Sequence, residues 1–172
     1  MVLLASTRRE ADQQSLPLPV MLLVPLVALG LQSLITLHFP LFDVVDLPLL
    51  VTVYFAMTWR NPISATVAGA LIGVAQDVLT QHPLGVFGIG KSVVGYLAAS
   101  LGVRIDTENH GTRLLVVFIS TLLHSGIFWL LQHRMLAQPL VWNWLREVIR
   151  AVVNALVALI LFALLDKTKR RD

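Results

Sequence analysis

Apolar runs of about 17 to 20 residues recur along nearly the whole chain, and each is long enough, or nearly so, to cross a bilayer as a helix. Only 13% of the 172 residues are charged, and the mean hydropathy is +0.78. A soluble domain of this length would carry about twice that charged fraction. The pattern therefore predicts an all-α integral membrane protein that forms one domain over residues 1–172.

The apolar runs predict six transmembrane helices with short connections. Their expected ranges are about 19–37, 42–59, 63–79, 84–103, 114–131 and 148–165. The second run is the shortest, because its continuous apolar part, 48–59, spans only about 18 Å. It is either a re-entrant piece or, as we prefer, a helix extended back into 41–45. The segment 1–15 is polar, and 166–172 forms a basic tail.

The basic residues predict the orientation in the membrane. Six crossings place both termini on one side, and nine of the 13 Lys and Arg residues fall there: Arg8, Arg9, Arg60, Arg104, Arg113, Lys167, Lys169, Arg170 and Arg171. The other side receives Arg134, Arg146 and Arg150, while Lys91 lies within the membrane. Loops rich in Lys and Arg stay in the cytoplasm, so we expect both termini to be cytoplasmic. The net charge of +3 then belongs to these loops and indicates no nucleic-acid partner.

The stretch 65–102 predicts a closely packed helical hairpin. Pro83 and Gly85 fit a tight turn between its two helices, because Pro removes a backbone donor and Gly allows positive φ. Small residues recur at helical spacing on both sides of the turn: Ala65, Gly69 and Gly73 before it, and Gly95, Ala98 and Gly102 after it. Small residues at this spacing let helix backbones approach closely. We expect these glycines to pack within the chain, with a partner interface as the alternative.

Two charged residues continue the same small-residue stripes. Asp77 lies seven residues before Leu84 and Lys91 lies seven residues after it. In a hairpin that turns at Leu84, both fall about 10 Å into the membrane. Charged groups at membrane depth usually face protein, so we expect Asp77 and Lys91 to pair. The alternatives are a partner contact for Asp77, access of Asp77 to water, and snorkelling of Lys91 to the outer interface.

The segment 85–92 also matches G-x-x-x-x-G-K-[ST], the phosphate-binding loop. That loop works after a buried β-strand, whereas a glycine-spaced helix precedes it here, so we exclude an ATPase. The chain has no cysteine, and its five histidines lack metal-ligand spacing. No paired carboxylates and no nucleophile–base set are visible. We predict a protein that is not an enzyme and needs no cofactor or metal.

Three further polar residues lie within predicted helices. His124 stands between serine and threonine neighbours, which favours an interhelical hydrogen bond over a proton relay or a ligand contact. Arg150 and Asn154 share one helical face near the outer side of the membrane. We expect Arg150 to reach lipid headgroups or a periplasmic partner, and Asn154 to form hydrogen bonds across helices.

Three short motifs follow one another along the hairpin: Gly69, Gly73 and Asp77 as G-x-x-x-G-x-x-x-D, then Pro83-Leu84-Gly85, then Gly95-Tyr96-Leu97. In a six-helix chain of this length they resemble the rod shape-determining protein MreD family of bacteria. The segment 46–56, DLPLLVTVYFA, also looks like the second helix of that family.

The resemblance implies a non-catalytic scaffold in the bacterial inner membrane, within the elongation (rod) complex that maintains cell shape. It would couple MreC and the MreB filament to lateral-wall peptidoglycan synthesis. The implied partners are an MreC-type single-span protein, the MreB filament, RodA, penicillin-binding protein 2 and membrane lipid. The fold of the family looks similar to the substrate-binding subunits of energy-coupling-factor transporters. The alternative function is therefore a vitamin-type small-molecule binding subunit of such a transporter.

Overall fold

The computed structural model describes residues 16–38, 44–107, 109–136 and 141–168. Within these ranges the chain forms six α-helices and no strand: α2 Leu18–His38, α3 Leu47–Trp59, α4 Pro62–Thr80, α5 Val86–Gly102, α6 His110–Leu130 and α7 Trp144–Asp166. A π-helical turn, Leu131–Met135, extends α6. The polar segment 1–15 and residues 169–172 of the basic tail lie outside the described residues.

Four of these helices are long and apolar enough to cross a membrane: α2, α4, α6 with its extension, and α7. The other two, α3 and α5, have 13 and 17 residues. Large apolar side chains point outward from the long helices, such as Leu26 on α2 and Leu156 on α7. Lipid is the environment in which such surfaces are stable. The prediction of an all-helical, multi-pass membrane protein is confirmed, with six helices of which four have spanning length.

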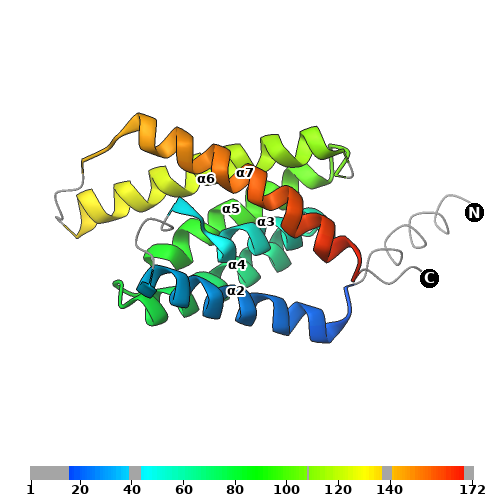
Figure 1. The fold of residues 1–172 in the computed structure, drawn as a ribbon, viewed down its shortest axis with the longest axis horizontal. Helices are drawn as coiled ribbons and strands as arrows, with labels where there is room; N and C mark the ends of the chain where they lie inside the picture. The colour runs from blue at the N-terminus through cyan, green and yellow to red at the C-terminus, as the bar shows by residue number, and fades with distance from the viewer. Residues whose placement is uncertain (1–15, 39–43, 108, 137–140, 169–172) are drawn as a thin grey trace, which may run out of the picture.

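The short helix α3 forms the centre of the molecule. It packs against α2, α4, α5, α6 and α7, and every residue from Pro48 to Thr58 is buried (Figure 1). We expected a helix over 42–59, and this is wrong because α3 begins at Leu47. Asp46 caps it, accepting a hydrogen bond from the Leu49 backbone N–H, and Pro48 lies in the first turn. A helix of this length covers about 20 Å, and its capped end is buried inside the bundle.

Two other helices begin earlier than predicted, at His110 and Trp144 rather than at 114 and 148. In both cases an asparagine stands before the first turn. Asn109 accepts from the Gly111 N–H, and Asn143 accepts from the N–H groups of the first turn of α7. Both first turns contain charged residues, Arg113 in α6 and Arg146 and Glu147 in α7, so the uninterrupted apolar pattern placed both boundaries too late.

The predicted hairpin is α4 and α5. A Cβ atom added to three of its four stripe glycines would come within 3.0 Å of a backbone oxygen of the other helix, whereas Gly102 faces Met57 of α3. The pairs are Gly69 with Lys91, Gly73 with Phe87, and Gly95 with Ala65. The glycines therefore pack within the chain, as expected. Gly85 has φ 99° in the connection, a conformation that glycine adopts without strain.

Candidate functional site

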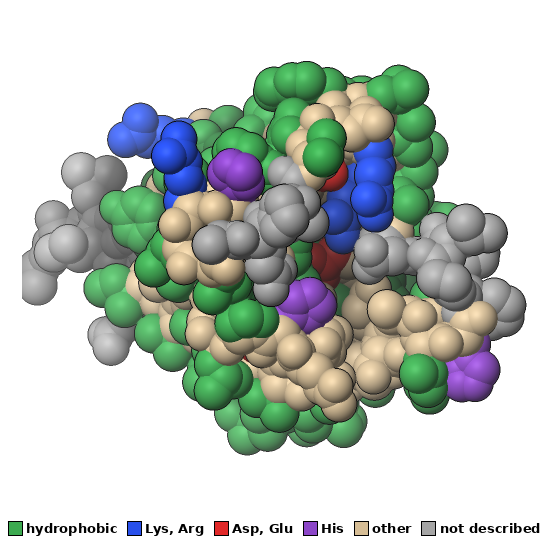
Figure 2. Space-filling view, turned by 90° about the vertical axis from the view of Figure 1, so that its left-hand side faces the viewer, with side chains coloured by type: hydrophobic (Ala, Val, Ile, Leu, Met, Phe, Trp, Pro, Cys, Tyr) green, Lys and Arg blue, Asp and Glu red, His purple; other side chains and the backbone are tan. Residues whose placement is uncertain are grey.

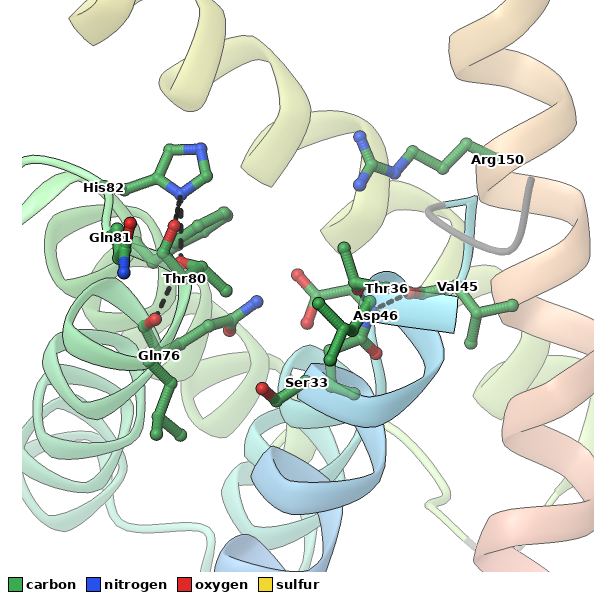
Figure 3. Close-up of a pocket in the computed structure, with 13 residues that line it drawn as sticks. Ser33, Thr36, Val45, Asp46, Gln76, Thr80, Gln81, His82 and Arg150 are labelled. Carbon is green, nitrogen blue, oxygen red and sulfur yellow. Dashed lines mark hydrogen bonds between the residues drawn. The ribbon is translucent and has the colours of Figure 1, made fainter. Parts of the chain in front are cut away.

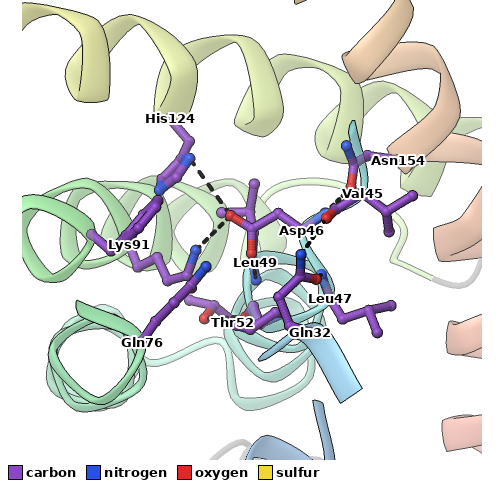
Figure 4. A network of polar contacts seen from close by, with 12 residues as sticks. Gln32, Val45, Asp46, Leu47, Leu49, Thr52, Gln76, Lys91, His124 and Asn154 are labelled. Atoms are coloured by element: carbon purple, nitrogen blue, oxygen red, sulfur yellow. Dashed lines mark hydrogen bonds and ion pairs between the residues drawn. The ribbon is translucent and has the colours of Figure 1, made fainter. Parts of the chain in front are cut away.

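A buried polar network surrounds the N-terminus of α3 (Figure 4). At its centre, Lys91 Nζ from α5 donates to Asp46 Oδ2 at 2.8 Å. The two side chains are 0% and 4% exposed. His124 of α6 places its Nδ1 atom 3.9 Å from the same oxygen. Charges removed from water need a partner and further hydrogen bonds, and Asp46 obtains both here.

Two side-chain amides hold the backbone that leads into α3. Gln32 of α2 donates to the Val45 carbonyl at 2.9 Å and accepts from the Leu47 N–H at 3.0 Å. Asn154 of α7 accepts from the Asp46 N–H at 2.9 Å. Its Nδ2 atom donates to the Val44 carbonyl at 2.8 Å. Non-helical backbone is tolerated at membrane depth only where protein groups satisfy it, and these two amides do so.

Asp77 has a different role from the one predicted. Its carboxylate is fully buried and accepts from the backbone N–H groups of Gly85, Phe87 and Gly88, at 2.8, 3.0 and 3.3 Å. It therefore caps α5 from the end of α4, where the unpaired N–H groups and the helix dipole favour a negative charge. These are the amides that a phosphate-binding loop would direct toward phosphate.

The expected Asp77–Lys91 pair is thus wrong, since Lys91 binds Asp46. The prediction assumed a symmetric turn at Leu84, but α4 ends at Thr80 and α5 begins at Val86. Asp77 then lies about 5 Å from its helix end, whereas Lys91 lies about 8 Å along α5. Lys91 is also beyond the capped first turn of α5, on the part of the helix that packs against α3.

Three other predicted residues lie at or beside this network. Asn154 forms hydrogen bonds across helices, as expected. His124 stacks on Phe87 with ring centroids 5.7 Å apart and approaches Asp46, and its Nε2 atom has no hydrogen-bond partner among the described residues. Arg150 points from α7 into an adjoining cavity (Figure 3).

A second polar cluster lies at the other end of the bundle. Arg113 forms an ion pair with Asp166 at 2.5 Å, and the Tyr54 hydroxyl donates to the same carboxylate at 3.1 Å. Arg113 Nε also donates to the Thr107 backbone carbonyl, and the Thr107 side-chain hydroxyl accepts from Arg60. The cluster joins α3, α6 and α7, and it brings Arg60 and Arg113 to one end of the bundle.

The chain was compared with models of known protein families. The model of the family described as rod shape-determining protein MreD matches residues 13–168. The chain belongs to the MreD family. Searches of the curated proteins and of the solved structures found no match.

Membership of the MreD family makes the chain a membrane component of the rod-shape-determining system. The match includes all six helices and every residue of the network around Asp46. Among the described residues, no group of three or more His, Cys, Asp or Glu side chains is arranged to hold a metal ion.

Asp46 and Gln32 were not predicted as members of the network. A signal for Asp46 was present, because Asp followed by Pro two residues later, before an apolar run, is typical of a helix start. No signal marked Gln32, since a single amide in an apolar helix indicates only some polar contact. In this chain both residues serve the same buried helix end.

Proposed function

We propose that the protein is a non-catalytic scaffold of the elongation complex in the bacterial inner membrane. In this role it docks an MreC-type single-span protein and couples it to the MreB filament and to the synthase pair, RodA and penicillin-binding protein 2. The observation that carries the proposal is the match of the MreD family to residues 13–168.

The way the helices are joined supports a scaffold role. The network around Asp46 contains side chains from α2, α3, α5, α6 and α7, so five helices meet at one buried point. Intramembrane charges often mark transport or catalysis. Here Lys91 and Asp77 are both engaged in holding helices together. A helix bundle joined in this way is rigid, and it can present the same surface to several partners.

The distribution of charge supports the proposed orientation. Arg60, Arg113 and Asp166 meet at one end of the bundle, while Arg146 and Arg150 lie near the other. With the basic side in the cytoplasm, the ends of α2 and α7 that carry the chain termini face the cytoplasm. The connections α2–α3, α4–α5 and α6–α7 then face the periplasm, where MreC would be bound.

Co-purification tests the scaffold directly. The protein is tagged at its C-terminus, extracted gently from native membranes, and its bound proteins are identified by mass spectrometry. We expect an MreC-type single-span protein, with or without RodA and penicillin-binding protein 2. Two ATP-binding-cassette ATPases with a coupling membrane subunit would instead make the protein a vitamin-capture subunit and overturn the scaffold.

Two glycine variants control for the folded state. Gly73→Leu forces a side chain into the α5 backbone and should abolish partner recovery together with folding. Gly126→Ala introduces a methyl group where nothing lies within 4 Å, so it should recover the same partners as the parent protein. Equal recovery with both variants would show that the retained proteins bind the tag or unfolded chain.

A further inference from the structure

A polar cleft opens at the end of the bundle where α4 turns into α5 and where α7 begins. It consists of two adjoining cavities of about 390 and 540 Å³. They share Gln81, His82, Phe87 and Arg150 in their walls. Figure 2 looks at this end and shows basic (blue) and acidic (red) side chains below the rim of a hollow. Cavities of several hundred Å³ are of the size that holds small molecules.

The cleft contains an unusual concentration of unpaired polar atoms. Four buried side-chain atoms have no hydrogen-bond partner within the described part of the chain: Gln76 Oε1, His124 Nε2, Trp142 Nε1 and Glu147 Oε2. All four belong to residues that line the cleft. Gln76 and His124 are each 5% exposed. Buried polar groups are nearly always paired, so their gathering in one place indicates a polar occupant.

The chemistry of these atoms restricts the occupant. The oxygens of Gln76 and Glu147 need donors, whereas the indole N–H of Trp142 needs an acceptor, and His124 Nε2 can take either role. Hydroxyl groups both donate and accept, so a molecule with several hydroxyls can serve all four atoms.

The walls of the cleft add two further features. Aromatic side chains form its apolar wall, and they pack against one another, as Phe87 does with His124 and Phe128. The wall consists of His82, Phe87, Phe128, Trp129 and Trp142. The Arg150 guanidinium points into the cleft in Figure 3, and Arg146 also lines it. Guanidinium groups bind carboxylate and phosphate oxygens with paired hydrogen bonds.

We propose that the polar cleft binds a sugar-sized polyhydroxylated molecule that carries an acidic group. Such a molecule has two sources, a fragment of cell-wall glycan or a free acidic sugar. The site is separate from the scaffold role, because binding of a small molecule requires none of the partner proteins.

Binding is tested by calorimetry on the full chain, purified in a detergent without a sugar headgroup so that the micelle does not compete. The probes are glucuronate, glucose as the neutral control, and a disaccharide–peptide fragment of peptidoglycan. Saturable binding of glucuronate or of the fragment supports the proposal, and the tighter of the two identifies the source. Glucose binding as tightly as either acid removes the acidic group from the proposal, and absence of saturation with every probe overturns the site.

Matched variants place the site. Trp142→Phe removes an unpaired N–H and keeps an aromatic ring, so binding should weaken about five- to tenfold, as expected for one lost hydrogen bond. Trp59→Phe is its control, because Trp59 lies at the C-terminal end of α3, stacks on Phe55 and does not line the cleft. Equal weakening by both variants contradicts the placement.

Gln76→Met separates a binding role from a structural one. It removes an amide oxygen that has no partner among the described residues, so the empty protein should melt at the same temperature or higher while binding weakens. A lower melting temperature with unchanged binding would show that Gln76 serves the fold alone and would count against the site.

Discussion

The buried ion pair between Lys91 and Asp46 should contribute measurably to the stability of the bundle. Lys91→Met keeps most of the side-chain volume but leaves the Asp46 carboxylate, which is 4% exposed, without its cation. Removing one partner of a buried pair costs about 3–5 kcal/mol, because the remaining charge stays desolvated. Asp46→Asn leaves Lys91 unpaired in the same way, although Asn still caps α3. We expect each single variant to lower the free energy of unfolding by about 3 kcal/mol.

The double variant decides whether the pair itself is responsible. Asp46→Asn with Lys91→Met removes both charges, and a neutral replacement of a buried pair is often close to neutral in stability. Its loss should therefore be smaller than the sum of the single losses by at least about 2 kcal/mol. The free energy of unfolding is measured by denaturant titration in mixed micelles, followed by the fluorescence of the four tryptophans.

A second cycle serves as the control. Asp77→Asn and Lys91→Met should couple by less than about 1 kcal/mol, because Asp77 binds backbone N–H groups of α5 and acts on Lys91 only through a minor Coulombic attraction. Additive losses for Asp46 with Lys91, together with strong coupling for Asp77 with Lys91, would refute the assignment of the pair.

Three other predictions concern the hairpin and the topology. Gly73→Ala should destabilise the protein by about 2 kcal/mol or more through its clash with the α5 backbone, whereas Gly30→Ala, with nothing within 4 Å, should be neutral or slightly stabilising in the same titration. Asp77→Ala removes the cap of α5 and should lower the free energy of unfolding by about 2 kcal/mol, with Asp77→Asn closer to the parent protein. The chain has no cysteine, so a single cysteine placed at Gln81 or at Thr168 reports the topology. A membrane-impermeant thiol reagent added to intact spheroplasts should label the cysteine at position 81 and not the one at position 168. The reverse pattern would contradict the proposed orientation.

Much of the helical architecture was predictable, because apolar length and small-residue spacing act locally. The turn at Pro83 and Gly85 and the contact of α4 with α5 follow from residues close together in the sequence. The start of α3 was not predicted, because hydrophobicity alone does not detect a cap. The helix begins directly after Asp46, although apolar residues also precede Asp46 in the sequence.

The buried network was predictable only in part. Lys91 and Asn154 were expected to bind across helices, and both do so. Their partners come from far along the chain, 45 residues away for Lys91 and 108 for Asn154. No local pattern carries that information, so the nearest opposite charge, Asp77, was chosen for Lys91. The structure shows that backbone donors compete with side chains for a buried carboxylate.

The polar residues of the network around Asp46 share one physical cause. Because α3 begins inside the bundle, its first N–H groups and the backbone before it need partners where no bulk water is present. Asp46 supplies the cap, Gln32 and Asn154 supply the amides, and Lys91 neutralises the charge that the cap introduces. Removing any one of these side chains leaves a buried polar group without its hydrogen-bond partner, so the effects of their substitution on stability should be coupled. The same helix start also lies beside the polar cleft, since Asp46 lines the smaller of its two cavities. A molecule bound in the cleft would therefore affect the packing of the five helices that meet at this point.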